Sequence, residues 1–277
     1  MSDAENASPL LWHLKVSPYN EKVRWALDHK GVPHLRRAAM PGSHRSVARR
    51  LGTGDTFPVL VMGGVAIGDS TRIVEALERR HPEPRLYPVE AGARVRALDL
   101  EDFFDEQLGP YLRLLVIHHA SRDPGLLLGM FAPDLTPARR ALARAGFGLI
   151  RRRTFAQFGI DDESVMGAFE RVRAAGERFR AELRPSGYLA SDGFSIADLT
   201  LAAMVSPVVA PPQFPYPQPQ RGHPLFAPLR DALAESGLLG WALHVYEHHR
   251  GASAEVGYQA SIRPRASFST SARLRAP

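Results

Sequence analysis

Residues 10–27 read LLWHLKVSPYNEKVRWAL, and this stretch decides how the fold begins. The apolar run over residues 10–16 is typical of a strand, whereas Val23 and Leu27 recur on one face of a helix. Ser17 therefore stands where a strand passes into a helix. Backbone N–H groups at a helix start have no partner within the helix and lie at the positive end of its dipole, so the position suits a developing thiolate.

Two later motifs point to the same kind of site. The motif Phe57-Pro58-Val59 stands at the start of a strand-like run, and a cis proline there would turn the backbone of the next residue toward the site. Asp69 and Ser70 open a helical pattern, where free N–H groups again favour an anion. Together with the first motif, they predict a thiol-binding pocket.

In their order and spacing, the three motifs resemble the glutathione transferase family, whose first domain is thioredoxin-like. The resemblance covers residues 10–81 and resumes near residue 194. It implies that glutathione is the cosubstrate and that Ser17 is the catalytic serine, as in zeta-like members. The Ser17 hydroxyl would donate a hydrogen bond to the sulfur and lower the pKa of the thiol from about 8.5 toward neutrality. The alternative is that Ser17 only caps the helix that begins at Pro18.

The resemblance also implies how the rest of glutathione binds. Pro58 and Val59 would lie along its peptide, with Val59 pairing with the peptide backbone, and Asp69 and Ser70 would hold its γ-glutamyl end. Tyr19 would place a second hydroxyl near the sulfur. The alternatives are a helix cap for Asp69 and Ser70 and a packing role for Tyr19.

The chain departs from the family pattern near the proline motif. Family members often carry a basic or amide residue near the position of Thr56. Recognition of the glycine carboxylate then falls to other residues, and His44, Arg45 and Arg49 are the candidates. The chain has no cysteine, so an omega-like thiol-disulfide exchange through position 17 is excluded. The nucleophile must arrive with the cosubstrate.

The first 81 residues alternate strand and helix signals. We predict strands over residues 10–16, 33–38, 58–62 and 65–67, and helices over 18–30, 43–51 and 70–80. Gly63-Gly64 between two apolar runs predicts a hairpin, because glycine adopts a positive φ without strain. These signals predict an α+β, thioredoxin-like domain over residues 10–81, preceded by a polar lead at 1–9.

From residue 91 the hydrophobic period changes to 3.6, which predicts an all-α helical-bundle domain over residues 91–250. Prolines at 82 and 84 end the preceding helix, so residues 82–90 are the predicted linker. Ser195 and Asp198 have the spacing of a capping box, which resembles that of the buried helix in the second domain of glutathione transferases.

Two segments of the second half do not read as helix. Seven prolines lie within residues 207–224, so this stretch is either an ordered loop or a lid, and it either lines the electrophile pocket or runs over the surface. Residues 251–277 contain few large apolar side chains and several arginines. We predict a flexible basic tail there.

The formal charge is +6, from 35 Lys and Arg against 29 Asp and Glu, and three of the basic residues are lysine. Arginine suits the carboxylates of glutathione, although a GC-rich genome gives the same bias. The arginine clusters are scattered, so no nucleic-acid partner is expected. We see neither a signal peptide nor a run long enough to span a membrane, so we expect a cytoplasmic protein without a membrane partner.

No metal site and no permanently bound cofactor are expected. Asp99, Asp102 and Asp105 are spaced by three, but no partner motif follows, so an acidic face is the favoured interpretation. His244 and His248 have the i,i+4 spacing of a metal pair without a signalled third ligand.

The favoured function is that of a glutathione S-transferase-like enzyme, which conjugates glutathione to a small hydrophobic electrophile. One alternative is a non-catalytic binding module of the same fold. Another is a transferase that uses a different low-molecular-weight thiol. A homodimer is compatible with either kind of enzyme.

Overall fold

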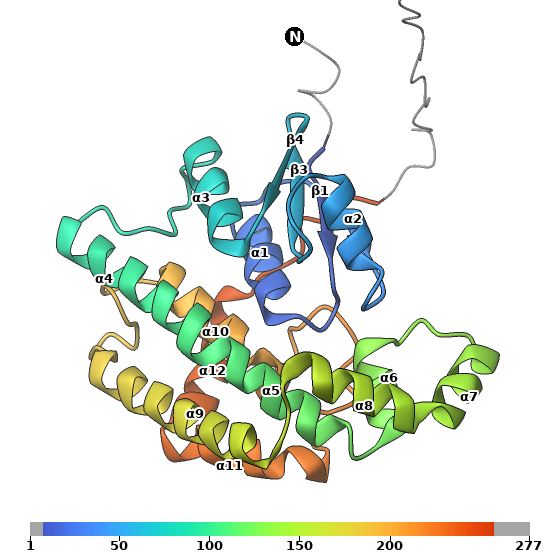
Figure 1. The fold of residues 1–277 in the computed structure, drawn as a ribbon. Helices are drawn as coiled ribbons and strands as arrows, with labels where there is room; N and C mark the ends of the chain where they lie inside the picture. The colour runs from blue at the N-terminus through green and yellow to red at the C-terminus, as the bar shows by residue number, and fades with distance from the viewer. Residues whose placement is uncertain (1–7, 258–277) are drawn as a thin grey trace, which may run out of the picture.

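The computed structural model describes residues 8–257, which begin with a four-stranded sheet and its helices (Figure 1). In chain order these are β1 (Leu10–His13), α1 (Pro18–His29), β2 (Leu35–Ala38), α2 (His44–Arg50), β3 (Val59–Met62), β4 (Val65–Gly68) and α3 (Ser70–Arg80). The strand order is β2-β1-β3-β4; β1 and β2 are parallel, and β3 is antiparallel to both of its neighbours. This arrangement confirms the predicted thioredoxin-like fold class.

Local sequence features produce this topology. Helix α1 is the crossover that returns the chain to the parallel strand β2. Gly63 and Gly64 have φ values of 59° and 79°, the left-handed conformation that a two-residue hairpin turn requires. β1 ends at His13, before the predicted end at residue 16, because the N–H of Leu14 donates to the side chain of Asn20 instead of continuing the sheet.

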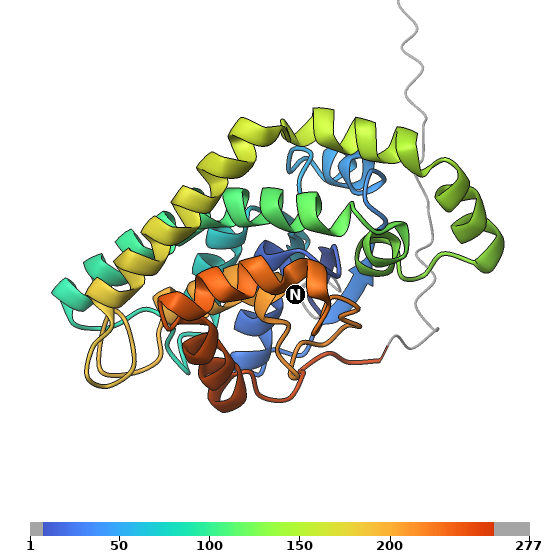
Figure 2. The ribbon, with the colours of Figure 1, turned by 90° about the horizontal axis from the view of Figure 1, so that it is seen from below.

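The second part is all-helical and confirms the second half of the predicted fold class. It consists of α4 (Ala91–Phe103), a π-helical turn (Phe104–Leu108), α5 (Gly109–Ala120), α6 (Pro124–Phe131), α7 (Pro137–Ala145), α8 (Phe147–Phe158), α9 (Asp162–Glu182), α10 (Ile196–Val209), a 3₁₀ turn (Pro224–Phe226), α11 (Ala227–Glu235) and α12 (Leu238–His249). α4, the π-helical turn and α5 follow one another without a break, and α9 packs along α5 (Figure 2).

Helix α10 joins the two parts, since every one of its residues is buried and it contacts α1, α4 and α12. The predicted capping box is present at its start: the Asp198 carboxylate accepts hydrogen bonds from the N–H of Ser195 at 2.9 Å and from its hydroxyl at 2.7 Å. Burial raises the pKa of Asp198 to about 6. Phe194 stacks on the ring of His249, with 4.3 Å between ring centroids.

Residues 251–257 lie against the sheet, which corrects the expectation of a tail that is loose from residue 251 onward. The N–H of Val256 donates to the carbonyl of His34 at 2.9 Å, just ahead of β2. The Asp28 carboxylate of α1 accepts the N–H of Ala254 at 2.8 Å. Hydrogen bonds to a buried carboxylate and to the sheet edge therefore hold this segment, and composition alone did not indicate either.

The rest of the predicted tail, residues 258–277, and residues 1–7 of the predicted polar lead lie outside the described residues. Among the helices of residues 8–257, none combines the length and the apolar character needed to cross a membrane.

Candidate functional site

Ser17 is the N-cap of α1, and Pro18 is the first residue of the helix. The carbonyl of Ser17 accepts the N–H of Glu21 at 3.0 Å, which begins the helical hydrogen bonding. The Ser17 hydroxyl makes no capping hydrogen bond with the part of the chain that the structure describes. This half-buried hydroxyl therefore stays available to a ligand at the positive end of α1.

Asn20, one turn into α1, joins the loop of Ser17 to the loop of Pro58. Its side-chain oxygen accepts the N–H of Leu14 at 3.1 Å, and its amide nitrogen donates to the carbonyl of Phe57 at 3.4 Å. Asn20 is fully buried. Sequence reasoning missed this residue, because an asparagine inside a helix gives no signal of which distant loops it will join.

The Phe57-Pro58 peptide is cis, and β3 begins directly after it. Val59 lies opposite Trp12 of β1 and Gly68 of β4, so its N–H and C=O, which point to one side of the strand, face one of these two neighbouring strands. The pairing of Val59 with a peptide ligand stays a prediction. Phe57 precedes the strand ladder, and its backbone is a second candidate for that contact.

Asp69 and Ser70 form the start of α3. The Asp69 carboxylate accepts the N–H of Arg72 at 3.1 Å, so Asp69 does cap the helix. Its φ of 71° is a left-handed conformation, which is costly for a residue other than glycine and tends to cluster at functional sites. Ser70 is buried in the first turn, where N–H groups have no partner within the helix. The start of α3 can therefore receive a carboxylate.

A buried charge cluster lies directly behind the start of α3. The Lys22 ammonium is 2.7 Å from a Glu101 oxygen, 2.5 Å from an Asp105 oxygen and 3.1 Å from the Thr71 hydroxyl. Burial alone would lower the pKa of Lys22, but Asp105 and Glu101 outweigh it and hold that pKa above its ordinary value. Burial raises the pKa of both carboxyl groups despite the neighbouring ammonium. The second oxygen of Asp105 has no hydrogen-bond partner among the described residues.

Tyr19 faces the helical domain, which corrects its expected place beside the sulfur. Its hydroxyl donates to the backbone carbonyl of Asp105 at 2.8 Å, and it packs so closely on Gly109 that a Cβ at that position would lie 2.3 Å from it. Burial raises the pKa of Tyr19. We therefore assign Tyr19 to the contact between the two domains.

Arg24 ties down the loop that leads to Ser17. Its fully buried guanidinium donates to the carbonyls of Leu14 and Lys15, both at 3.2 Å, and lies 3.0 Å from Nδ1 of His13. Burial and the positive charge of Arg24 lower the pKa of His13 to about 2. A neutral His13 can accept from Arg24 through Nδ1, and its Nε2 lies 3.3 Å from the Tyr216 hydroxyl.

The proline-rich loop after α10 is ordered and lies beside the Ser17 loop. The ring of Tyr216 stacks on that of His13, with 5.4 Å between centroids, and Arg221 donates to the carbonyl of Ala210 at 2.9 Å. Lys15 and Val16 line a small cavity together with this loop. The loop therefore lies beside the Ser17 loop, and its role as a wall of the electrophile pocket stays a prediction.

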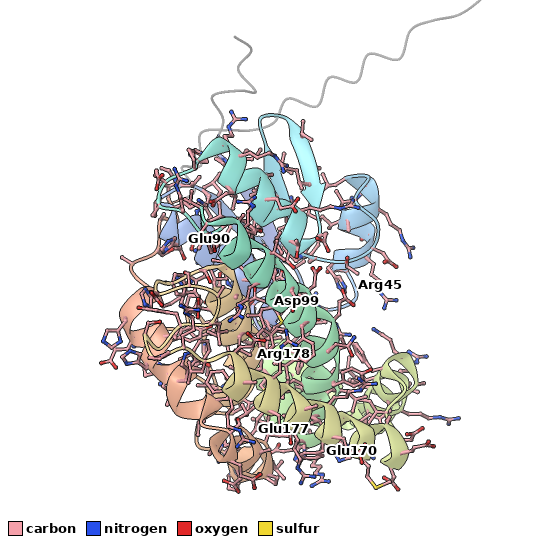
Figure 3. The ribbon with its side chains drawn as sticks, turned by 90° about the vertical axis from the view of Figure 1, so that its left-hand side faces the viewer. Arg45, Glu90, Asp99, Glu170, Glu177 and Arg178 are labelled. Atoms are coloured by element: carbon pink, nitrogen blue, oxygen red, sulfur yellow. The ribbon has the colours of Figure 1, made fainter. Side chains whose placement is uncertain are left out.

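Helix α2 carries the three candidates for a terminal carboxylate. The side chain of Arg45 extends from α2 away from the body of the molecule (Figure 3). Arg49 forms an exposed ion pair with Asp55 at 3.2 Å. The ring of His44 packs edge-on against that of Phe57, with 5.7 Å between centroids. His44 thus contacts the proline motif directly through Phe57.

The three spaced aspartates do not converge on one point. Asp99 pairs with Arg178 of α9 at 2.7 Å, and the two side chains lie on neighbouring helices (Figure 3). Asp105 belongs to the buried Lys22 cluster. Within residues 8–257 there is no group of three or more histidine, aspartate or glutamate side chains arranged to hold a metal ion.

A known family model matches the first part of the chain. Residues 11–85 match the family model for the N-terminal domain of glutathione S-transferases. A search of curated protein sequences found no match. The matched range extends from β1 through α3, the sheet and its helices.

Solved structures share the fold over most of the chain. A β-etherase, LigF, from Sphingobium sp. strain SYK-6 is 18% identical, with a TM-score of 0.61 over 87% of this chain and 96% of its own. A glutathione S-transferase from Rhodospirillum rubrum F11 is 20% identical, with a TM-score of 0.59 over 93% and 96%. Another, from Methylobacterium radiotolerans in complex with glutathione sulfonate, is 19% identical, with a TM-score of 0.55 over 92% and 98%. At these identities the comparisons establish a glutathione transferase-like fold.

Proposed function

We propose that this protein is a cytoplasmic enzyme that binds glutathione at the starts of α1 and α3 and conjugates it to a small hydrophobic electrophile. The observation that carries the proposal is the Ser17 hydroxyl, which occupies the N-cap of α1 without making a capping hydrogen bond with the described residues. A plain cap would use this hydroxyl on a backbone N–H of the first turn. Here the hydroxyl is left for the sulfur of a bound thiol.

In the proposed reaction, Ser17 donates a hydrogen bond to the thiolate, and the positive end of α1 adds to its stabilisation. The thiol proton passes to solvent, the sulfur forms a bond to the electrophilic carbon, and the leaving group departs with its bonding electrons. Each unit by which the thiol pKa falls corresponds to about 1.4 kcal/mol of thiolate stabilisation. One hydrogen bond to a charged group is of the size needed.

The remaining contacts would hold the two ends of the peptide. The backbone of Phe57 would pair with the middle of glutathione, and Ser70 with the first N–H groups of α3 would bind the γ-glutamyl carboxylate. The unpartnered oxygen of Asp105, next to Thr71, is our candidate for the γ-glutamyl ammonium. His44 would donate its Nε2–H to the glycine carboxylate as a neutral ring, since burial and the charge of Arg45 lower the pKa of His44 and its Nδ1 accepts the N–H of Gly42.

A different low-molecular-weight thiol is the second candidate cosubstrate. Such a thiol need not carry the glycine carboxylate for which the side chains of α2 are the candidates. Calorimetric titration with glutathione, followed by conjugation assays with several thiols, tests the proposal. We expect glutathione to bind and the Ser17→Ala variant to bind it with similar affinity but to conjugate it more slowly. If no thiol binds, the function is not that of a transferase, and the chain is a non-catalytic module of this fold.

A further inference from the structure

The cavity beside the Ser17 loop has a mainly apolar wall with a positive charge on one side. Val16, the residue before Ser17, lines it together with Met130 of α6 and with Phe214 and Tyr216 of the proline-rich loop. Its volume is about 10 Å³, the room of about one water molecule. An organic ligand can therefore enter only if a side chain at the border moves away.

The border contains one pair of side chains that can separate easily. The Lys15 ammonium lies 2.7 and 2.9 Å from the two oxygens of Asp134, and these side chains are 25% and 63% exposed. Lys15 lines the cavity, and so does Pro133, the neighbour of Asp134, so the pair joins two sides of it. Exposed ion pairs add little to stability, because water solvates both charges when they part.

Other cations near the cavity are already engaged, and Arg140 donates to the carbonyl of Pro133 in the cavity wall at 2.9 Å. Arg24 lies over the ring of Tyr216, 5.1 Å from its centroid, but its guanidinium is fully buried among Glu21, His13 and two loop carbonyls. Lys15 also lies over the same ring, at 5.7 Å. Lys15 is thus the cation that can exchange its partner, and Asp134 occupies the place of an incoming carboxylate.

One uncharged polar group in the cavity wall also lacks a hydrogen-bond partner among the described residues. The amide nitrogen of Gln218 donates to the carbonyl of Pro211 at 2.7 Å, which fixes the amide orientation. The amide oxygen of Gln218 is buried and has no partner in the described range. A ligand hydroxyl or N–H group would satisfy it.

We infer that the electrophile of this enzyme is an aromatic acid, whose carboxylate displaces Asp134 from Lys15 and whose ring packs against Phe214. The inference rests on the proposed function, since it names the second substrate of that reaction. Displacement of Asp134 opens the cavity, so the anionic group both admits the substrate and orients it toward the thiol. Neutral electrophiles of the same size lack this means of entry.

Glutathione conjugation to 4-(bromomethyl)benzoate and to benzyl bromide tests the inference, with each rate divided by the uncatalysed rate. In both reactions the sulfur–carbon bond forms as the carbon–bromine bond breaks and bromide leaves. We expect kcat/KM to favour the acid at least tenfold in the unmodified chain. Lys15→Met should abolish the preference by weakening conjugation of the acid alone, and Lys15→Arg should restore it. Asp134→Asn should lower KM for the acid several-fold, because the competing carboxylate is gone.

The matched control is Asp192→Asn, which removes another exposed carboxylate, paired with Arg184 at 3.0 Å in the loop between α9 and α10. It should leave the preference unchanged. Equal rates for both bromides, or a preference that survives in Lys15→Met, would overturn the inference while leaving the transferase function intact. Failure of the chain to bind glutathione or to conjugate either bromide would overturn the proposed function, and the inference with it. Calorimetry with S-(4-carboxybenzyl)glutathione and S-benzylglutathione gives a second readout: Lys15→Met should weaken binding of the first only.

Discussion

The Lys22 ammonium lies 2.7 Å from the Glu101 carboxylate, and neither side chain reaches solvent. Lys22 belongs to α1 and Glu101 to α4, so the pair connects the sheet domain to the helical domain. Asp105 adds a second buried carboxylate at 2.5 Å. The cluster therefore has two acidic groups for one base, directly behind the helix start at Ser70.

Replacement of Lys22 by methionine should lower the free energy of unfolding by about 3–5 kcal/mol at neutral pH, because two buried carboxylates lose their cation. A carboxyl group whose pKa is higher in the folded than in the unfolded state makes stability fall as pH rises through the folded pKa. Burial already raises the pKa of Glu101 and Asp105, and the variant should raise both further. The loss should therefore be smallest below about pH 4 and largest at neutral pH.

Urea denaturation at pH 4 and pH 7.5 measures this dependence. Glu101→Gln is the matched variant, since it leaves one carboxylate for one ammonium and should cost less than Lys22→Met at pH 7.5. An equal loss for Lys22→Met at both pH values would show that its effect comes from packing alone.

Ser17→Ala should reduce the conjugation rate roughly 10- to 1000-fold and leave the melting temperature nearly unchanged, because the Ser17 hydroxyl makes no capping hydrogen bond with the described residues. The pH–rate profile should shift toward higher pH, since the thiol loses a donor. Ser43→Ala is the control, as Ser43 is also a helix N-cap without a side-chain capping bond in the described chain. An unchanged profile in Ser17→Ala would remove the catalytic assignment.

Ser70→Ala should weaken glutathione binding more than it slows turnover, because Ser70 would hold the end of the peptide remote from the sulfur. We expect the Kd to rise several-fold and kcat to change less than twofold. Titration calorimetry and saturation kinetics separate the two effects. Undiminished affinity would reject the placement of the γ-glutamyl group at α3.

The sequence best predicted those structural features that depend on residues close together in the chain. The hairpin at Gly63-Gly64 and the capping box of Ser195 and Asp198 depend on residues one to three positions apart, and both are present. Ser17 likewise stands at the helix start that its neighbours indicate.

Contacts between distant residues were not predictable from local patterns. Asn20 contacts Phe57 because the folded sheet brings their loops together. His13 contacts Tyr216 because the proline-rich loop after α10 returns to the Ser17 loop. Val59 lies in an inner strand whose backbone groups face neighbouring strands, and only the strand register shows this. The Asp28 carboxylate accepts a hydrogen bond from the N–H of Ala254, which lies almost a whole chain length away in sequence. The composition of residues 251–277 could not indicate this bond.

Arg24→Lys should lower kcat about tenfold while the Kd for glutathione stays within about twofold. A lysine keeps the charge but cannot reach the carbonyls of Leu14 and Lys15 and the ring of His13 together, so the loop before Ser17 loses its fixed position. Arg184→Lys, in an exposed ion pair, is the control and should change neither value. A rise in Kd with unchanged kcat would show that Arg24 supports binding of the thiol rather than placement of Ser17.

A chain that ends at Arg250 should be less stable than one that ends at Gly257 by about 1–3 kcal/mol. The shorter chain loses the hydrogen bond from Val256 to His34 and the two that Ser253 and Ala254 donate to Asp28. Asp28 keeps its ion pairs with Arg36 at 2.6 Å and with Arg250 at 2.9 Å, which limits the loss.

Urea denaturation of the two chains measures the contribution of residues 251–257, and Ser253→Ala in the longer chain should reproduce only a small part of it. Glutathione affinity should be the same in both chains, because none of these contacts involves Ser17, Phe57 or Ser70. Equal stability of the two chains would mean that Arg36 and Arg250 satisfy Asp28 without help from the segment. A loss of affinity in the shorter chain would instead show that the segment acts on the site, through the buried pairs that link Arg250 to Glu21 at 2.7 Å and Glu21 to Arg24 at 2.8 Å.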